Sequence, residues 1–368
     1  MTNEPTVVVV GAGYGGVNAA KALDDHTNVV LVEAKDAFVH SVGALRALVE
    51  PEFAPRIFLP YTKLLARGRV VHDRAVEIGA HHVTLASGET IAADFVVIAT
   101  GSSYPFPAKS DLDETAPALE KYRAAYDRLV RASRVLLVGA GAVGIELAGE
   151  IKAAWPDKHV ILFDSAADVL GEQFRTDLKA ELRAQLAELG VELKLGVGLQ
   201  ALPPVPETEL APFRVVTETG EAIEADMWFR CFGVRPQSDI LDAELATARG
   251  ADGFLRVRPT LQLEGFDTVF AIGDVTNADA KMAGRAGRQA HLAAENIRLL
   301  IMGRADVLEE YEPLPPAIIV PIGPHLGSGQ LPNQDDLAPR EMVVAAKGND
   351  LMVDRYAEIL GVPIDVVS

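Results

Sequence analysis

Residues 6–16 read Thr-Val-Val-Val-Val-Gly-Ala-Gly-Tyr-Gly-Gly, and this stretch decides the fold of the chain. The valine run predicts a buried strand, the glycines predict a tight turn, and the alanine-rich residues up to about Leu23 predict a helix. A GxGxxG spacing brings backbone N–H groups at the start of such a helix close to a pyrophosphate. The next apolar run ends on Glu33, 22 positions after the first glycine, where a carboxylate accepts hydrogen bonds from ribose hydroxyls. We therefore predict a dinucleotide site made of Gly11, Gly13, Gly15, Gly16 and Glu33.

The same pattern returns in the middle of the chain. The apolar residues 134–138 lead into Gly139, Gly141 and Gly144, and a later apolar run, residues 159–163, ends on Asp164. Asp164 lies 25 positions after Gly139, so we expect the intervening helix to have an extra turn around residues 155–157. One GxGxxG is a weak signal, but two, each with its strand, helix and acid, predict two dinucleotide sites. Because a carboxylate repels a 2′-phosphate, Asp164 favours NADH over NADPH if this site holds the nicotinamide cofactor.

A longer internal repeat supports this duplication. Residues 83–101 resemble residues 215–233, and three positions map onto one another at an offset of 132: Gly88, Asp94 and Gly101 onto Gly220, Asp226 and Gly233. Self-similarity at one offset indicates two copies of one supersecondary unit. Each copy predicts a hairpin turned at Ser-Gly or Thr-Gly, and then a buried strand that delivers a glycine beside the nucleotide. Thr100, Gly101 and Gly233 are therefore candidate cofactor-binding residues.

The chain then returns to its first domain. An apolar run, residues 269–272, ends on Gly273 and Asp274 and is followed by a helical pattern from about Met282 to Ile301. This arrangement suits a flavin, with Asp274 near its ribitol and phosphates and the helix N-terminus facing its ring. Frequent prolines from residue 308 mark a further unit. We predict an α/β protein with two Rossmann-like domains and a small C-terminal domain: residues 1–108 and 250–307 form the first dinucleotide-binding domain, residues 109–249 the second, and residues 308–368 the third.

Composition excludes several classes of protein. The 368 residues contain 34 Lys and Arg against 52 Asp and Glu, and a net charge of −18 opposes nucleic acid and anionic lipid. The single cysteine, Cys231, cannot form an internal disulfide, a CxxC pair or a thiolate zinc site, and we expect no metal site. Neither a signal peptide nor an apolar run long enough to span a membrane is evident. We expect a cytoplasmic protein, with peripheral membrane contact and a homodimer left open.

The motifs together resemble the FAD-dependent pyridine nucleotide-disulfide oxidoreductase superfamily. Residues 36–50, 99–107 and 281–284 look most like its ferroptosis-suppressor and apoptosis-inducing-factor-like mitochondrion-associated branch, relatives of type II NADH dehydrogenases. The resemblance implies FAD at the first site, NADH at the second, and an FAD-dependent NAD(P)H:quinone oxidoreductase that passes two electrons to a small-molecule quinone. It also implies that Glu146 lies near the nicotinamide amide, with a surface glutamate as the alternative. Thr2 replaces the glycine that carries an acyl anchor in animal members, and the last 60 or so residues match loosely.

Three further residues have two interpretations each. Disulfide reductases carry a cysteine pair where this chain has residues 38–44, so electrons must leave directly, and His40 either serves a quinone oxygen there or is satisfied in a packed turn. Lys281 either supplies a cation to the reduced flavin or is a solvated lysine. Arg46 lies near the FAD phosphates or at the surface. His40, Lys281 and Glu146 are the candidate catalytic residues, and Arg46 and Lys281 are candidate cofactor contacts.

Two other functions fit the same motifs. A ferredoxin or rubredoxin reductase shares the fold and the missing thiols, but it needs a basic docking face, for which Arg67, Arg69 and Arg74 are the candidates. A redox-sensing flavoprotein would act through partner binding rather than turnover.

Overall fold

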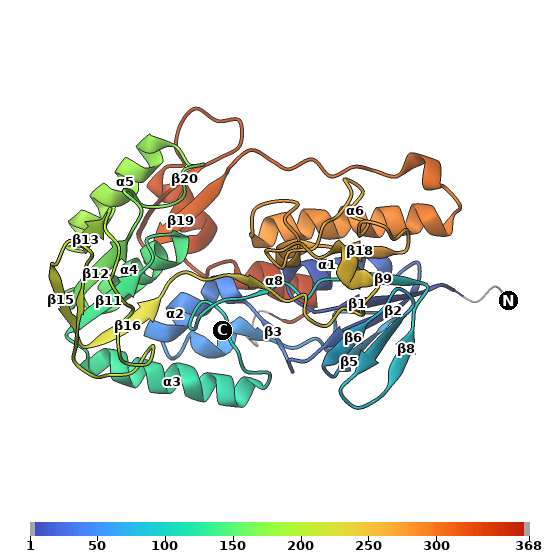
Figure 1. Ribbon diagram of the computed structural model, residues 1–368, viewed down its shortest axis with the longest axis horizontal. Coiled ribbons are helices and arrows are strands. Elements are labelled where there is room, and N and C mark those ends of the chain that lie inside the picture. The colour runs from blue at the N-terminus through green and yellow to red at the C-terminus, as the bar shows by residue number, and fades with distance from the viewer. Residues whose placement is uncertain (1–3, 364–368) are drawn as a thin grey trace.

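The computed structural model describes residues 4–363, and it contains two parallel sheets that lie beside each other along the length of the molecule (Figure 1). The first sheet has the strand order β18-β9-β1-β2-β5, and the second has the order β13-β12-β11-β16. Every pair of neighbours in both sheets is parallel. The predicted α/β class is confirmed. The strands are β1 (Thr6–Val10), β2 (Asn28–Glu33), β5 (Arg69–His72), β9 (Phe95–Ile98), β11 (Arg134–Val138), β12 (His159–Asp164), β13 (Glu192–Leu195), β16 (Met227–Arg230) and β18 (Val269–Ala271).

Each glycine motif follows the central strand of its sheet. β1 pairs with both β2 and β9, and β11 pairs with both β12 and β16. Strands covered on both faces need continuous apolar runs, which explains why neither motif strand alternates. The helix after each motif is α1 (Tyr14–Leu23) or α4 (Ala142–Ala154). α4 is longer than α1, with 13 residues against 10, but it ends at Ala154. Residues 155–157, where the extra helical turn was expected, follow the helix as a non-helical turn, because Trp155 has an extended φ of −139° and Pro156 comes next.

The 132-residue repeat folds as two copies of a hairpin-and-strand unit. β6 (Ala75–Ile78), β7 (His82–Leu85) and β8 (Thr90–Ala92) form an antiparallel sheet against the first parallel sheet. β14 (Phe213–Val216) and β15 (Ala222–Ala225) pair as a hairpin against the second. Gly88 and Gly220 both have φ +90°, a left-handed conformation that favours glycine, so both hairpins turn in the same way.

The chain crosses between the two halves twice, at one short ladder. β10 (Ser102–Ser103) pairs with β17 (Arg235–Pro236) in antiparallel fashion. After the second crossing Leu241 forms a bridge with Ile78, and Leu245 and Ala248 join the core of the first sheet. The return to the first half therefore begins before residue 250. We retain the three-domain division as a proposal, with the crossings at this ladder.

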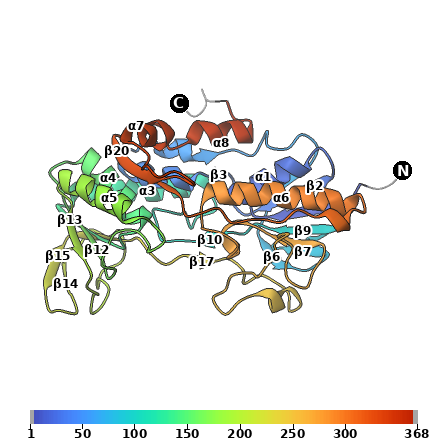
Figure 2. The ribbon, with the colours of Figure 1, turned by 90° about the horizontal axis from the view of Figure 1, so that it is seen from above.

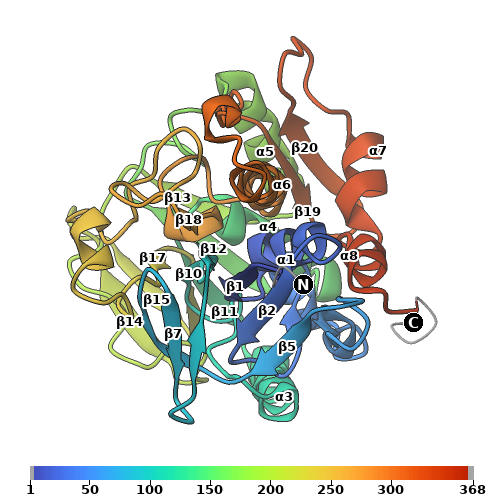
Figure 3. The same cartoon turned by 90° about the vertical axis from the view of Figure 1, so that its right-hand side faces the viewer.

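Helices cover the other face of the sheets. α6 (Ala283–Ile301) packs along α1 (Figure 3), and α2 (Ala44–Val49) packs against α3 (Thr115–Arg131) and α4. α5 (Thr176–Glu188) lies against α4. The short strands β3 (Phe38–Val39) and β4 (Phe58–Leu59) pair beside α2. One hydrophobic core includes residues of both halves.

The C-terminal segment packs against both halves instead of standing apart. It contains β19 (Ile318–Ile322), β20 (Leu326–Gln330), α7 (Arg340–Val343), a π-helical turn (Val344–Gly348) and α8 (Val353–Leu360), and it follows one long edge of the molecule (Figure 2). The β19–β20 hairpin covers α4 and α5. α8 lies on the first half, where the Tyr356 ring stacks on Phe38 with centroids 5.6 Å apart. Residues 364–368 of the predicted third domain, and Thr2, lie outside the described residues.

A buried ion pair joins the two halves. Arg46 on α2 and Glu150 on α4 form a bidentate pair, with Nε–Oε2 3.2 Å and Nη2–Oε1 3.0 Å. Arg46 Nη1 donates to the carbonyls of Gly348 (2.8 Å) and Asn349 (3.0 Å) in the C-terminal segment. Both side chains of the pair are 3–4% exposed, so water cannot replace either partner. Arg46 therefore connects three parts of the chain.

Glu150→Gln is expected to lower the free energy of unfolding by about 3–5 kcal/mol, because it leaves the Arg46 guanidinium buried without its counter-charge. Urea unfolding measures this loss. Asp127→Asn is the control, since it breaks the exposed Arg123–Asp127 pair on α3 and should cost less than about 1 kcal/mol. Equal losses in the two variants would contradict the role given to the buried pair.

Candidate functional site

The first and third glycines of each motif are required by close backbone packing. A Cβ on Gly11, whose φ is +97°, would lie 2.5 Å from the Ala99 carbonyl oxygen, and one on Gly16 would lie 1.8 Å from the Gly11 oxygen. In the second motif a Cβ on Gly144 would lie 1.9 Å from the Gly139 oxygen. Gly139 itself has φ +113° and lies against the Cys231 carbonyl. These four glycines allow the turn and the close approach of helix to strand.

The second glycine of each motif faces open space. A Cβ added to Gly13 or Gly141 would meet no atom within 4 Å. Both residues have negative φ, so their backbone conformation also tolerates a side chain. Each is the N-cap of its helix and has no side-chain cap, so the first N–H groups of α1 and α4 are left for another acceptor. The same open space surrounds Gly101 and Gly233, at the ends of β9 and β16. This geometry fits a dinucleotide pyrophosphate at both motifs.

Gly15 has a different surrounding. A Cβ there would lie 3.3 Å from the Ile272 side chain and 3.7 Å from Ala286 on α6. Gly15 therefore serves the packing of α1 against α6. Its N–H belongs to the uncapped first turn of α1, so its role as a cofactor contact stays a prediction.

The acid at the end of each second strand holds its own glycine loop. Glu33 Oε2 accepts the Ala12 N–H at 2.5 Å, and Asp164 Oδ2 accepts the Ala140 N–H at 2.7 Å. The other carboxylate oxygens accept the N–H groups of Lys35 (3.0 Å) and Ala166 (2.8 Å). Spacing predicted where these acids lie, and the structure adds that they fasten the turn that faces the pyrophosphate.

Asp274 lies between the first sheet and α6, in a network that spacing did not reveal. Its Oδ2 accepts a hydrogen bond from Ser102 Oγ at 2.7 Å and is 3.0 Å from Lys109 Nζ. The N–H of Gly273 donates to Gln289 Oε1 at 2.6 Å, which ties the loop to α6. Thr100 Oγ1 donates to the Gln237 carbonyl at 2.6 Å and so fixes the two crossing segments together. Lys109 was missed because no motif surrounds it.

Lys281 is partly buried, and its ammonium group has partners within the protein. It precedes the first residue of α6, its Nζ donates to the Thr276 carbonyl, and it lies 4.4 Å from the centroid of the Phe254 ring. Partial burial lowers the pKa of its ammonium, while Asp274 and nearby acids act in the opposite direction. Lys281 is thus partly packed and partly open to solvent, and a direct contact with a flavin stays a prediction.

His40 is fully buried and both ring nitrogens have partners. Nε2 donates to the Leu351 carbonyl at 2.7 Å, so Nδ1 accepts from the Tyr14 hydroxyl at 3.2 Å. Burial lowers the pKa of the imidazole to about 4, and the ring is neutral at physiological pH. This arrangement favours the packed-turn alternative over a histidine that donates a proton to a substrate. Tyr14, inside the first motif, completes an aromatic cluster with Phe38 and Tyr356.

Glu146 is not a surface residue. It lies in the second turn of α4, its side chain is 16% exposed, and its Oε1 is 3.8 Å from Lys347 Nζ. Burial raises the pKa of this carboxyl to about 7, with Glu150 adding to the rise and Lys347 opposing it. Glu146 therefore changes charge in the neutral pH range.

Arg46 differs from both of its sequence-based interpretations. It is 3% exposed, which excludes the surface position. Its donors bind Glu150 and the carbonyls of Gly348 and Asn349, which corrects the expected contact with FAD phosphates. A buried guanidinium with four such bonds has little left to offer a ligand.

The expected basic docking face is not realised by its three candidate arginines. Each one is paired with a carboxylate: Arg67 with Glu4, Arg69 with Glu89, and Arg74 with Asp113.

Within residues 4–363, no group of three or more His, Cys, Asp and Glu side chains could hold a metal ion. In the same part of the chain, no helix is both long and apolar enough to cross a membrane.

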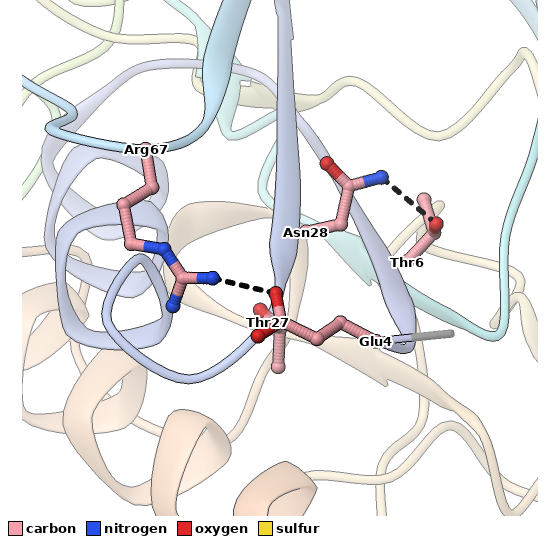
Figure 4. A pocket seen from close by; sticks show the side chains of 5 residues that line it. All are labelled: Glu4, Thr6, Thr27, Asn28 and Arg67. Atoms are coloured by element: carbon pink, nitrogen blue, oxygen red, sulfur yellow. Dashed lines mark hydrogen bonds and ion pairs between the residues drawn. The ribbon is translucent and has the colours of Figure 1, made fainter. Parts of the chain in front are cut away.

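A polar pocket of about 380 Å³ opens at the amino ends of β1 and β2 (Figure 4). Arg67 pairs with Glu4 across it, and Asn28 Nδ2 donates to Thr6 Oγ1 at 3.0 Å. Ligands of parallel α/β sheets bind at the carboxyl ends of the strands, where the glycine loops lie. The pocket is at the opposite edge and belongs to neither dinucleotide site.

Comparison with known proteins agrees with this geometry. Residues 5–296 match the pyridine nucleotide-disulphide oxidoreductase family. The chain belongs to this family. It is 32% identical to ferroptosis suppressor protein 1 of Taeniopygia guttata, over 96% of this chain and 95% of that protein. It is 30% identical to apoptosis-inducing factor homolog B of Dictyostelium discoideum, over the full length of both.

Solved structures share the fold at lower identity. The reduced CoADR-RHD of Bacillus anthracis superposes with a TM-score of 0.70 and 20% identity, over 89% of this chain and 61% of that one. A ferredoxin reductase of the CYP199A2 system from Rhodopseudomonas palustris gives a TM-score of 0.67 and 19% identity, over 86% and 79%. Family membership and the two open glycine loops together make the protein an NAD(P)H-dependent flavin oxidoreductase.

Alanine at the two open glycines should separate the two sites. Gly13→Ala is expected to fold but to lose bound flavin, because the new methyl group occupies the space left for a pyrophosphate. Gly141→Ala should keep the flavin and raise the KM for the nicotinamide cofactor about tenfold or more, equivalent to about 1.4 kcal/mol. Flavin absorbance after purification and steady-state kinetics measure the two effects. Loss of flavin from both variants would contradict the assignment of separate sites.

Glu146→Gln should change how stability depends on pH. The folded state holds the Glu146 proton up to about pH 7, whereas the unfolded chain releases it near pH 4.5, so wild-type stability falls between those values by up to about 3 kcal/mol. The glutamine variant lacks this loss. Urea unfolding from pH 5 to 8 measures it, with Glu120→Gln on the exposed side of α3 as the control. Parallel curves for wild type and Glu146→Gln would show that the carboxyl titrates normally.

Proposed function

We propose that the protein is an FAD-dependent NADH:quinone oxidoreductase. The observation that carries this proposal is the pair of equivalent open glycine loops, at Gly13 and Gly141, in a chain with no cysteine in residues 38–44. Two nucleotide sites allow hydride to pass between two cofactors, and the missing thiols leave no disulfide to reduce. The acceptor must therefore take electrons from the flavin directly.

FAD is assigned to the first site and NADH to the second. The first loop is backed by α6 and Asp274, which follow β18 and suit the ribitol and ring of a flavin. In the described part of the second sheet no strand lies beyond β16 to take the place of β18. Asp164 presents a carboxylate where a 2′-phosphate would lie, and the residues after it, Ser165 to Asp168, offer no cation. These features favour NADH over NADPH.

The residues of the chain have separate tasks in this reaction. Bound FAD would take a hydride from the nicotinamide and pass two electrons to the quinone. Gly13 and Gly141 let α1 and α4 direct their first N–H groups at the two pyrophosphates. The ionised Glu146 carboxylate would accept the N–H of a bound nicotinamide carboxamide and orient its ring. The N-terminal end of α6, with Lys281 before it, would stabilise the negative charge that a bound flavin gains.

A quinone fits the remaining features better than a protein carrier does. Arg67, Arg69 and Arg74 are each neutralised by an acid, and the net charge is −18, so an acidic ferredoxin meets no evident basic face on them. We propose that the protein works in the cytoplasm and meets quinone at the membrane surface as a peripheral protein.

Stopped-flow absorbance of the holoenzyme tests the proposal. NADH should bleach the flavin in the absence of oxygen much faster than NADPH does, by about tenfold or more, because Asp164 repels the 2′-phosphate. Mixing the reduced enzyme with a soluble ubiquinone or menaquinone analogue should restore the absorbance within the turnover time.

Each step of this experiment can contradict a different part of the proposal. Bleaching without recovery in quinone would refute the acceptor and point to a protein acceptor or a sensing role. Equal bleaching by NADPH would refute the cofactor preference. No bleaching by either nucleotide would refute the second site.

A further inference from the structure

The loop that follows β12 begins and ends on the second glycine motif. At its start Asp164 Oδ2 accepts the Ala140 N–H at 2.7 Å, and at its end the Leu170 N–H donates to the Ala140 carbonyl at 3.0 Å. We call residues 164–170 the Asp164 loop. Since one residue of chain spans at most about 3.6 Å, Asp168, two residues before Leu170, must lie close to this motif.

The middle of the Asp164 loop is small and open. Ser165, Ala166 and Ala167 are exposed, so no bulky side chain of the loop fills the space beside the Asp164 carboxylate. Asp164 Oδ1 accepts the Ala166 N–H at 2.8 Å, so both oxygens of this carboxylate already have backbone partners. A 2′-phosphate would therefore meet little steric hindrance from the loop. Its exclusion depends on the charge of Asp164 and on whether a cation is available to offset that charge.

A cation lies at this loop, but an acid holds it. Arg183 on α5 donates from Nη1 to Asp168 Oδ1, and the two side chains are 39% and 32% exposed. The same oxygen accepts the N–H of the fully buried Val169 at 2.8 Å, which fixes the carboxylate on the loop. Burial acts to raise the pKa of the Asp168 carboxyl, but the hydrogen bonds from Arg183 and Val169 outweigh it and hold that pKa below its ordinary value. Asp168 is therefore ionised at neutral pH and neutralises the guanidinium.

Lys179, one turn earlier on α5, is a less available cation. It also acts on the Asp168 carboxyl, but it is buried, whereas Arg183 is open enough to turn toward a ligand. A guanidinium also binds phosphate through a planar fork of two donors, which an ammonium lacks. Arg183 is thus the side chain of α5 best suited to a phosphate at the Asp164 loop.

We propose that Asp168 is a specificity-determining residue of the second site: by pairing with Arg183, it withholds a latent phosphate-binding side chain from the 2′-phosphate of NADPH. Discrimination against NADPH then has two parts, which are the repulsion by Asp164 and the sequestration of Arg183 by Asp168. The inference rests on the proposed function and deepens it, because it concerns which nicotinamide cofactor the second site accepts.

Asp168→Asn in the holoenzyme is the main test. Asparagine keeps the oxygen that accepts the Val169 N–H but removes the negative charge, and this frees Arg183. The affinity for NADP⁺ should rise about tenfold, because a charge-assisted hydrogen bond to the 2′-phosphate is gained, and the ratio of kcat/KM for NADPH to that for NADH should rise with it. The gain should shrink in about 1 M salt, which screens exposed charges.

Two further variants isolate the contribution of Arg183. Asp168→Asn combined with Arg183→Met should lose the gain in NADP⁺ affinity. Asp177→Asn is the matched control, because it removes one acid from an exposed pair with Arg175 at the start of the same helix, and it should leave the ratio of the two kcat/KM values unchanged. An equal gain in Asp177→Asn would reveal a general effect of net charge and overturn the proposal. A gain that survives the loss of Arg183 would overturn it as well.

Binding of adenosine nucleotides gives a readout that does not depend on turnover. With FAD bound at the first site, calorimetric titration with 2′,5′-ADP and with 5′-AMP isolates the 2′-phosphate at the second. Asp168→Asn should raise the affinity for 2′,5′-ADP alone, and equal changes for both nucleotides, or no change, would overturn the role of Asp168. Failure of NADH to reduce the wild-type flavin would refute the proposed function itself, while the titrations would still decide whether Arg183 binds the phosphate.

Discussion

The Arg46 guanidinium is the interaction on which the arrangement of the molecule depends. It is buried, and a buried charge is tolerated only when it is paired and hydrogen-bonded. Its partners come from α4 of the second half and from Gly348 and Asn349 of the C-terminal segment, so the three parts of the chain cannot separate without leaving a charge exposed or unpaired. Arg46 is suited to this because its planar fork binds a carboxylate bidentately and still has Nη1 for two carbonyls. Lysine could not make the same set of contacts.

The two halves build their glycine loops from the same structural elements. In each, a central buried strand ends in a turn that only glycine can make, the helix begins with free N–H groups, and an acid from the next strand holds the loop. This duplication brings two dinucleotide sites into one chain, which is the requirement for moving a hydride between cofactors. What differs between the halves is their surroundings: α6 and Asp274 support the first site, whereas Glu146 and Lys347 lie beside the second.

The family relationship and the geometry inform different levels of function. Membership of the pyridine nucleotide-disulphide oxidoreductase family agrees with a flavin, a nicotinamide cofactor and electron transfer. Which electron acceptor is used depends on the residues around the flavin. This chain lacks, in residues 38–44, the thiols that disulfide reductases use. The aromatic cluster of Tyr14, Phe38 and Tyr356 brings the C-terminal segment against the first glycine motif, so this segment contributes to the surroundings of both sites.

The sequence by itself determined the parts of this protein that depend on local patterns. Valine runs, glycine spacing and the 132-residue repeat predicted the strands, the helices after the two glycine motifs and the acids that end β2 and β12, because these features follow from steric rules acting over a few residues. Only the tertiary structure shows where the side chains of Arg46, His40 and Glu146 lie and which groups they contact. Arg46 and Glu150 are 104 positions apart, and His40 and Leu351 are 311 apart, so no local pattern records their contacts. Burial then sets which groups are charged, and burial is a property of the packed molecule as a whole.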